Sequence, residues 1–244
     1  MNNRLTVGII GAMDCEISEL KNKLENLKET KYGELLINTG TLFDHNIVLV
    51  KSGVGKVNAA LCTQFIIDKF QPDYIINTGI AGGIAENLEV GDIVIGEDLV
   101  QYDFDVSAIG YAKGYMCTGK NSDKPTLFSS NKELISAFEK IKISNGKILK
   151  GIIASGDTFV SDIKKKNEIR QTFNATAVEM EGCAIAQVST VNKIPFLIVR
   201  AISDLADNNA GKSHIFVEEE MAKVSSSAIS DLLKELSNKK LLKI

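Results

Sequence analysis

The stretch PFLIVRAISD, residues 195–204, decides the fold that we expect for this chain. Its mostly apolar, β-branched run has the length of one strand and reads as buried on both faces. Strands of that kind are typical of parallel sheets covered by helices. The run ends in an aspartate, so it also predicts a carboxylate at the carboxyl end of the sheet, where α/β proteins bind ligands.

Other short β-branched runs surround this strand in the sequence and are separated by segments with helical periodicity. The other predicted strands are LTVGII (5–10), ELLINT (34–39), NIVLVKS (46–52), DYIINT (73–78), DIVIG (92–96) and ILKGIIAS (148–155). The alternation favours an α/β fold with a central, mixed, largely parallel twisted sheet flanked by helices. We expect one domain over residues 1–244, a length that suits one substantial core.

The C-terminal segment predicts a long amphipathic helix that closes the core. Its apolar face is formed by Val217, Met221, Val224, Ala228, Leu232 and Leu236. Residues 111–131 are rich in Gly, Ser, Asn and Pro and keep no period, so we predict a long surface loop there. Loops of this length in compact domains are often functional.

The composition argues against several classes of protein. A net charge of −3 with scattered Lys and Arg gives no basic surface for a phosphate backbone, so we expect no nucleic-acid partner. No segment approaches the ~20 apolar residues of a membrane helix, and the N-terminal region lacks the apolar core of a secretory signal. We therefore expect a cytoplasmic protein with no membrane partner.

Cysteine and histidine usage agrees with that location. The four cysteines lie far apart without a CxxC pair, which is typical of reduced thiols in a cytosol. His45 and His214 are the only histidines, and neither is near a cysteine in the sequence, so we expect no metal site.

The glycine-rich stretch SGVGK, residues 52–56, follows a predicted strand, and its amides could face an anion. It is not a Walker loop, because Val50 and Val57 stand where Gly and Ser or Thr belong, and Asn58 breaks the Rossmann pattern. We expect a tight strand-to-helix turn. The second stretch, NTGIAGG, residues 77–83, allows a ligand to approach the backbone closely.

Carboxylates follow several of the predicted strands. Glu16 comes just past the first strand, and Glu179 and Glu181 follow the short ATAV run. Asp204 ends the strand PFLIVRAISD. Each has an ordinary explanation as a helix cap or a solvated side chain. Strand alternation puts Arg200 and Asp204 on the same side, which predicts that both face one pocket.

Seven segments together are similar to one family, the methylthioadenosine/S-adenosylhomocysteine nucleosidases, within the nucleoside phosphorylase fold. They are GIIGAMDCEI (8–17), VKSGVGKVNAA (50–60), INTGIAGG (76–83), VGDIVIG (90–96), ASGDTFV (154–160), AVEMEGCAIA (177–186) and VRAISDLAD (199–207). The resemblance runs nearly end to end. It implies cofactor-free hydrolysis of the N-glycosidic bond of 5′-methylthioadenosine, S-adenosylhomocysteine and 5′-deoxyadenosine to adenine and the thioribose, in methionine salvage.

The resemblance also assigns roles to residues. It implies that Asp204 protonates adenine N7, that Glu16 holds and deprotonates the attacking water, and that Glu181 binds the ribose hydroxyls. Adenine leaves readily only once it is protonated, and a carboxylic acid keeps its proton near neutral pH only in an apolar, poorly hydrated site. The ribose then gains oxocarbenium character, which nearby negative charge stabilises.

The remaining site residues come from the same resemblance. Met180 is expected to pack on the sugar, Phe159 to stack on the purine, Val160 to bond the adenine edge through its main chain, and Arg200 to organise the carboxylates. Further substrate contacts are expected from Gly82, Glu179 and Ser203. An apolar subsite for the alkylthio group is expected from Met13, Val54, Val106, Ile109 and Phe216, with Val106 and Ile109 reaching across a homodimer that shares its pockets. Core packing is the ordinary explanation for such apolar residues.

Two positions depart from the family pattern. Ile80 stands where family members often carry Ser, and Tyr102 stands where they often carry His.

Three other functions stay open. A nucleoside phosphorylase would want several arginines for phosphate, whereas the chain has only Arg4, Arg170 and Arg200, and Glu16 would repel a phosphate dianion. A futalosine-type hydrolase fits the same chemistry. A non-catalytic nucleoside-binding protein is the third alternative, because of Ile80.

Overall fold

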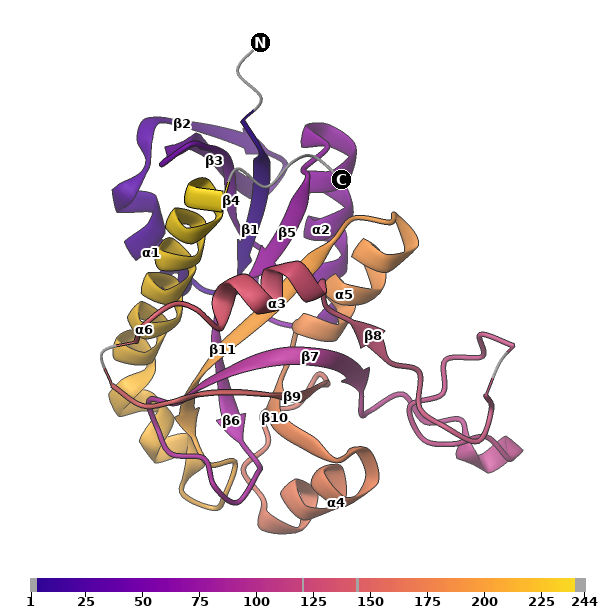
Figure 1. Cartoon of the computed structure of the whole chain (residues 1–244). Helices are drawn as coiled ribbons and strands as arrows, with labels where there is room; N and C mark the ends of the chain where they lie inside the picture. The colour runs from indigo at the N-terminus through magenta and orange to yellow at the C-terminus, as the bar shows by residue number, and fades with distance from the viewer. Residues whose placement is uncertain (1–3, 120, 144, 240–244) are drawn as a thin grey trace.

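The computed structural model describes residues 4–119, 121–143 and 145–239, and its described strands form an eleven-stranded sheet in the order β2-β3-β4-β1-β5-β11-β6-β10-β9-β7-β8 (Figure 1). The strands are β1 (Thr6–Gly11), β2 (Glu25–Tyr32), β3 (Leu35–Leu42), β4 (His45–Lys51), β5 (Tyr74–Asn77), β6 (Ile80–Gly83), β7 (Ile93–Gln101), β8 (Phe128–Ser129), β9 (Ile148–Ser155), β10 (Ala175–Glu179) and β11 (Phe196–Asp204). All seven predicted strands are confirmed. The mixed α/β class is confirmed as well.

The helices lie on both sides of the sheet, as predicted. They are α1 (Asp14–Lys23), α2 (Lys56–Phe70), α3 (Lys132–Phe138), α4 (Ile163–Phe173), α5 (Gly182–Val191) and α6 (Ala210–Lys239), with one 3₁₀ turn, η1 (Ser107–Ile109). In Figure 1, α1 and α6 lie side by side on one face, and α2 and α5 lie together on the other. Within the described ranges, no helix is both long and apolar enough to cross a membrane.

Strand β11 lies between the two helical layers, and its alternate residues supply both cores. Leu197 and Val199 join the core that includes α1 and α6, whereas Ile198 and Ile202 join the core that includes α2 and α5. Every residue of β11 is buried. Burial on both faces is the reason this strand reads as a continuous apolar run.

Part of the sheet closes on itself, which the sequence analysis did not predict. Strand β11 pairs in parallel with β5 and β6 and antiparallel with β7, while β6, β10, β9 and β7 follow one another in the sheet. Strands β11, β6, β10, β9 and β7 therefore form a closed ring. The β4, β1 and β5 strands extend the sheet from β11 as a parallel array.

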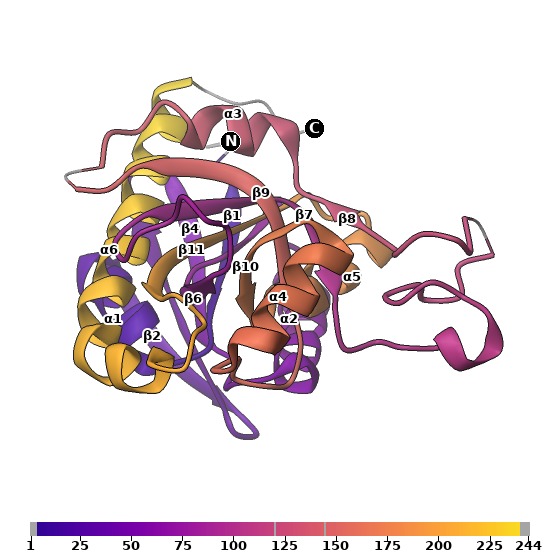
Figure 2. The ribbon, with the colours of Figure 1, turned by 90° about the horizontal axis from the view of Figure 1, so that it is seen from below.

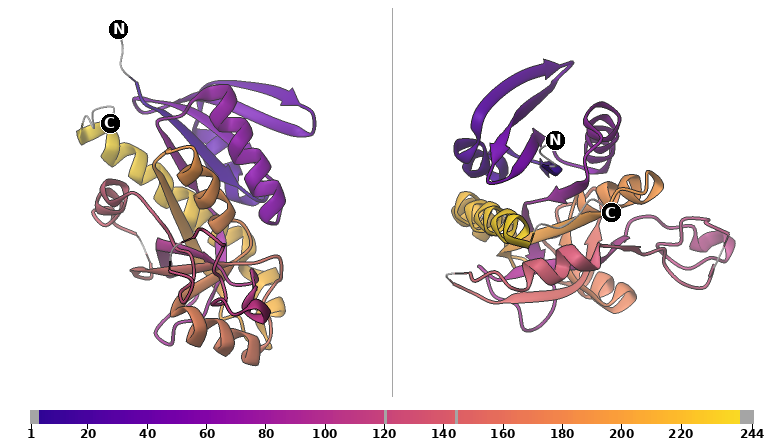
Figure 3. Two further views of the ribbon diagram at one scale, coloured as in Figure 1. Left: turned by 90° about the vertical axis from the view of Figure 1, so that its right-hand side faces the viewer. Right: turned by 45° about the horizontal axis from the view of Figure 1, so that its top comes forward.

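The observed elements differ from the predicted ones in several places. Strand β7 runs on to Gln101 instead of ending at Gly96, and β2 was not predicted because most of its side chains are polar and exposed. The predicted loop 111–131 contains the short strand β8, which pairs with β7. Part of the segment between β7 and β8, including η1, extends away from the body of the molecule (Figures 2 and 3), whereas Tyr102 at its start is buried in the core.

Candidate functional site

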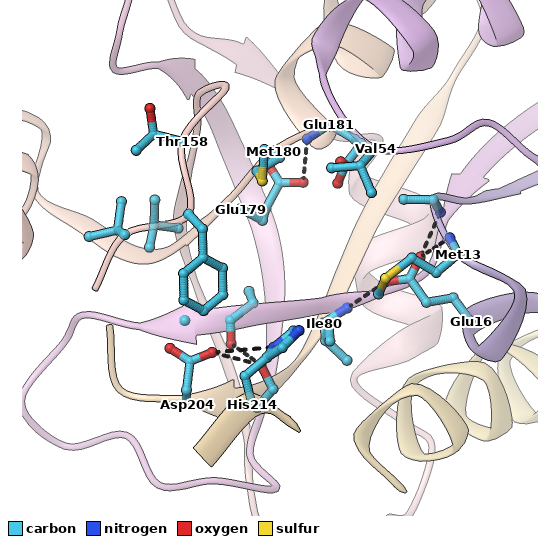
Figure 4. A pocket seen from close by; sticks show the side chains of 17 residues that line it. Met13, Glu16, Val54, Ile80, Thr158, Glu179, Met180, Glu181, Asp204 and His214 are labelled. Carbon is cyan, nitrogen blue, oxygen red and sulfur yellow. Dashed lines mark hydrogen bonds and ion pairs between the residues drawn. The ribbon is translucent and has the colours of Figure 1, made fainter. Parts of the chain in front are cut away.

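A cavity opens where β1, β10 and β11 end, so residues far apart in the sequence meet there (Figure 4). Its lining comes from the β1–α1 junction, the turn before α2, strand β6, the segment after β9, the ends of β10 and β11, and the start of α6. The lining residues are Ala12, Met13, Glu16, Val54, Ile80, Ala81, Gly82, Thr158, Phe159, Val160, Val178, Glu179, Met180, Glu181, Ser203, Asp204 and His214. Figure 4 places Asp204 and His214 on one side and Glu16 and Met13 on the other. Two carboxyl groups at opposite ends of one cavity allow acid and base chemistry on a single ligand.

Asp204 ends β11 as a buried side chain with 2% exposure. Its Oδ1 accepts a hydrogen bond of 2.8 Å from the Ala206 amide, and its Oδ2 accepts one of 2.9 Å from the Ser203 hydroxyl. A Cβ on Gly82 would lie 3.0 Å from Asp204 Oδ1, so a side chain at position 82 would crowd the carboxyl. The carboxyl is thus fixed in place beside the cavity.

Glu16 lies in the first turn of α1 and is 3% exposed. Its Oε2 accepts hydrogen bonds from the amides of Ala12 (2.6 Å) and Met13 (3.1 Å), and its Oε1 accepts one from the Ile80 amide (3.1 Å). Burial raises the pKa of Glu16 above its usual value, although the Arg200 charge and these three amides oppose the rise. A buried carboxylate with a raised pKa is a better base toward water than an exposed one.

The departure at Ile80 does not remove a contact with Glu16, since the bond to Glu16 comes from the main-chain amide of residue 80. The side chain of Ile80 lines the cavity and packs with Ala201 and Met221. A hydroxyl at this position is therefore not needed to hold Glu16.

Arg200 lies behind the cavity wall, buried at 1% exposure, and does not line the cavity. Its guanidinium donates to Glu179 and, at 2.5 Å, to Asn77 Oδ1, and it lies 3.9 Å from Glu181 Oε2. The prediction that strand alternation turns Arg200 and Asp204 into one pocket is wrong. The register of β11 against β6 shifts between Ile202 and Asp204, and this irregularity breaks the alternation.

Glu179 and Glu181 follow β10 and meet different partners. Glu179 accepts hydrogen bonds from the Ser155 hydroxyl, from Arg200, and from the amides of Glu181 (3.0 Å) and Gly182 (2.7 Å) at the start of α5. Its oxygens are thus engaged by the protein, although it lines the cavity. This geometry fixes the N-terminus of α5 and, through it, the position of Glu181.

Glu181 has fewer donors than its neighbour. Its Oε1 accepts a hydrogen bond of 2.8 Å from the Gly55 amide in the turn before α2. Burial and the nearby Glu179 charge raise the pKa of Glu181 to about 8, against the opposing effects of Arg200 and the Gly55 amide. The predicted strand-to-helix turn at 52–56 is confirmed, and one anion that faces its amides is this side chain.

The segment after β9 carries Thr158, Phe159 and Val160 into the cavity wall. The Tyr102 hydroxyl donates to the Thr158 carbonyl at 3.2 Å, and the Tyr102 ring fills the space beside Gly156, where a Cβ would come within 2.5 Å of it. Tyr102, the second departure from the family pattern, therefore shapes this segment. Phe159 is 43% exposed, so one of its ring faces is free for a planar ligand.

The structure brings most of the predicted site residues to one cavity. Those that line it are Met13, Glu16, Val54, Gly82, Phe159, Val160, Glu179, Met180, Glu181, Ser203 and Asp204. Val106, Ile109 and Phe216 do not line the cavity of this chain, and Ile109 and Phe216 are 71% and 85% exposed. Val106 and Ile109 belong to the segment that extends away from the body.

Six lining residues were not assigned to the site from the sequence: Ala12, Ile80, Ala81, Thr158, Val178 and His214. Five of them lie within the family-like segments GIIGAMDCEI, INTGIAGG, ASGDTFV and AVEMEGCAIA. Membership of these segments was therefore the sequence feature that could have placed them in the site. His214 lies in none of the segments, and nothing in its sequence context points to the site.

Comparisons with known proteins agree on one family. The sequence profile of the phosphorylase superfamily matches residues 6–237. The 5′-methylthioadenosine/S-adenosylhomocysteine nucleosidase of Staphylococcus aureus is 41% identical over 232 residues, which cover 94% of this chain and 100% of that protein.

Solved structures lead to the same group. The MTA/SAH nucleosidase of Colwellia psychrerythraea 34H, in complex with adenine, has a TM-score of 0.90 and 37% identity over 96% of each chain. The futalosine hydrolase of Helicobacter pylori strain 26695 has a TM-score of 0.87 and 28% identity over 95% of this chain and 98% of its own. The chain therefore belongs to the phosphorylase superfamily and, within it, to the 5′-methylthioadenosine/S-adenosylhomocysteine nucleosidases.

Proposed function

We propose that this chain hydrolyses the N-glycosidic bond of 5′-methylthioadenosine and S-adenosylhomocysteine, releasing adenine and the corresponding thioribose. The observation that carries the proposal is that Asp204 and Glu16 line opposite sides of one cavity, with the exposed ring of Phe159 in its wall. The Staphylococcus aureus relative bears the name of this activity, and the Colwellia psychrerythraea relative was solved with adenine.

Asp204 is the general acid of the proposed reaction. Its carboxyl O–H bond breaks as an N7–H bond forms on adenine, so the base leaves as a neutral molecule. The Ala206 amide and the Ser203 hydroxyl hold the carboxyl in one orientation and stabilise the carboxylate that remains. Phe159 stacks on the purine, and the main chain at Val160 bonds the adenine edge.

Glu16 is the general base. It takes a proton from water while the water oxygen bonds to the anomeric carbon, and its raised pKa favours that transfer. The three amides of Ala12, Met13 and Ile80 keep the carboxylate aimed at one place. Arg200 acts on Glu16 and Glu179 from behind the wall and does not touch the substrate.

The ribose lies between the two acids. Glu181 accepts hydrogen bonds from the ribose hydroxyls and, when ionised, stabilises the positive charge that develops on the ring. Met180 packs on the sugar, while Met13 and Val54 contribute to the apolar subsite for the alkylthio group. Gly82 and Ser203 complete the wall beside Asp204.

A homodimer completes the apolar subsite. Helices α2 and α5 leave Val57, Leu61 and Val191 at 77%, 59% and 75% exposure, an apolar patch that a second copy of the chain would cover. In the dimer, Val106 and Ile109 of the extended segment reach the cavity of the partner subunit. The four free cysteines suit a reducing compartment, so we place the reaction in the cytoplasm.

Product analysis in phosphate-free buffer tests the proposal. Incubation with 5′-methylthioadenosine or S-adenosylhomocysteine should release adenine, whereas inosine should stay intact, and chromatography should detect each product. A rate that rises many-fold on addition of phosphate would show phosphorolysis and contradict hydrolysis. A nucleoside that stays intact throughout would contradict an enzyme of this class.

A futalosine-type substrate is the second candidate, favoured by the likeness to the Helicobacter pylori futalosine hydrolase. Competition with aminodeoxyfutalosine distinguishes a futalosine-type hydrolase from a methylthioadenosine nucleosidase. Strong inhibition of adenine release from 5′-methylthioadenosine, with turnover of the competitor at a higher kcat/KM, would assign the chain to that activity.

A further inference from the structure

His214 lies beside the proposed acid although no part of the proposed reaction uses it. It is in the first turns of α6, lines the cavity, and its Nδ1 atom is 3.9 Å from Asp204 Oδ2 (Figure 4). Its ring meets Phe159 edge-on, with the centroids 5.2 Å apart. Among the described residues, this buried Nδ1 has no hydrogen-bond partner, which is unusual for a buried polar atom.

The opposite nitrogen of the ring faces another carboxylate. His214 Nε2 lies 3.5 Å from Glu218 Oε2, one helical turn further along α6. Exposure increases along this series, from 3% for the Asp204 side chain to 23% for His214 and 32% for Glu218. The three side chains thus form a line of titratable groups from the buried acid to solvent.

The proposed reaction leaves a proton imbalance after each turnover. Asp204 has lost a proton to adenine N7, and Glu16 has gained one from water on the other side of the cavity. Asp204 is 2% exposed, so bulk water has little direct access to return the missing proton. A second turnover needs a donor within reach of Asp204.

We infer that His214, supported by Glu218, is a proton relay that restores the Asp204 carboxyl after each turnover; this inference rests on the proposed function. The imidazolium Nδ1–H bond breaks and an O–H bond forms on Asp204 Oδ2. The neutral ring then takes a proton from bulk water or a buffer acid, and the Glu218 carboxylate stabilises the ring while it is charged. A hydrogen bond needs about 3 Å, so the ring must move about 1 Å toward Asp204, and such contacts often tighten only during catalysis.

Other titratable groups near the relay come from neighbouring elements. Cys15 on α1 contacts Glu218 at 3.6 Å, and the Lys166 side chain on α4 acts electrostatically on Asp204 while donating to the Leu205 carbonyl. Neither contacts the Nδ1 atom, so replacement of His214 removes the relay without removing these groups.

The test is rapid-quench kinetics of adenine release from 5′-methylthioadenosine with the full chain and its His214→Gln variant. We expect the variant to release a first adenine per site at close to the wild-type rate, because the relay acts only after the first adenine has formed. Later turnovers should be slower by about tenfold or more, because the loss of a side chain that transfers a proton has at least an effect of this size. Added imidazole should speed the later turnovers and leave the first unchanged.

Glu218→Gln should show the same pattern more weakly, which keeps the test valid if the His214 variant folds poorly. Glu219→Gln is the matched control, since it removes an exposed carboxylate one residue further along α6 and should behave like the wild type. A merely structural role, through the ring contact with Phe159, would slow the first and later turnovers together or raise KM, without rescue by imidazole. That pattern, or wild-type behaviour of His214→Gln, would overturn the relay and leave the proposed function intact. Absence of any adenine from the wild-type chain would overturn both.

Discussion

The buried carboxyl groups of the site differ in the donors that face them. Glu16 accepts three main-chain hydrogen bonds, Asp204 accepts one amide and one hydroxyl, and Glu181 accepts a single amide. Fewer donors leave a buried carboxylate less stabilised, which agrees with the raised pKa of Glu181. The three carboxyl groups therefore lie in three different hydrogen-bonding environments of one cavity.

Replacement of Asp204 by Asn tests the acid. The amide is nearly the same shape but has no proton to give adenine, so we expect kcat to fall by about 10²–10⁴-fold while the nucleoside still binds. Adenine release and calorimetric binding measure the two effects. Asp231→Asn, an exposed isosteric change on α6, is the control and should keep its activity. Turnover near the wild-type rate in Asp204→Asn would show that another group is the acid.

The raised pKa of Glu181 predicts a pH dependence of stability in the ligand-free protein. Its pKa is about 8 in the folded chain and 4.5 as the ordinary value, so the folded state holds the proton more tightly. The stabilisation is complete below the ordinary pKa and is lost as pH rises through about 8. Glu16 contributes in the same direction.

Urea unfolding at several pH values between 5 and 9 measures this effect. Glu181→Gln should reduce the fall in the free energy of unfolding across that range, because glutamine does not titrate. Glu34→Gln is the control, since the Glu34 side chain is 97% exposed. Equal pH dependence in the wild type and Glu181→Gln would mean that Glu181 is already ionised in the folded protein.

At the scale of elements, the turn between β4 and α2 connects the fold to the site. Gly55 has φ of 98° and ψ of 158°, a conformation that only glycine adopts readily, and its amide donates to Glu181. The next amide, that of Lys56, donates to Asp157 Oδ1 at 2.8 Å, in the segment that carries Phe159. One turn thus holds both Glu181 and the segment that carries Phe159, on two sides of the cavity.

Gly55→Ala should therefore impair both stability and activity. We expect a loss of about 1–3 kcal/mol in the free energy of unfolding from backbone strain, and a fall in kcat/KM because the Gly55 amide shifts away from Glu181. Chemical denaturation and adenine release measure the two effects. Gly91→Ala is the matched control, since Gly91 has φ of 97° with open space around a Cβ and lies outside the cavity lining. If Gly91→Ala lost as much activity as Gly55→Ala, strain alone would account for the result.

At the scale of the whole molecule, the part of the β7–β8 segment around η1 extends beyond the ring of β11, β6, β10, β9 and β7 (Figure 2). That segment carries Ile109 at 71% exposure, and the α2 and α5 face carries the exposed residues Val57, Leu61 and Val191. Exposed apolar surfaces of this kind are what the proposed second copy of the chain would cover.

Leu61→Asp tests the proposed dimer. A carboxylate in an apolar interface is costly, so light scattering should show a shift from dimer to monomer. Adenine release should fall with it, because Val106 and Ile109 no longer reach the other subunit. Leu27→Asp on the edge strand β2 is the control and should leave the dimer intact. A monomeric Leu61→Asp variant with full activity would show that each chain completes its own pocket.

Much of this arrangement was predictable from local patterns. Strands with at least one buried face show up as short apolar, β-branched runs, so the seven predicted strands were found. Strand β2 was missed because hydrogen bonds to β3, and not burial of its side chains, hold it in the sheet. The short strand β6 was not predicted, because its glycines leave little hydrophobic signal.

Local sequence patterns were enough to predict the α/β class, the carboxylates at the ends of strands and, through motifs along the chain, most of the cavity lining. The folded arrangement was needed to show that Arg200 lies behind the cavity wall, that Glu181 meets Gly55 and that His214 faces Asp204. The position of Arg200 depends on a shift in strand register. Glu181 and Gly55 are 126 positions apart in the sequence, and His214 and Asp204 are 10 positions apart. Local patterns fix which residues form an element and which face is buried, whereas the packing of elements against one another fixes which side chains meet across a cavity.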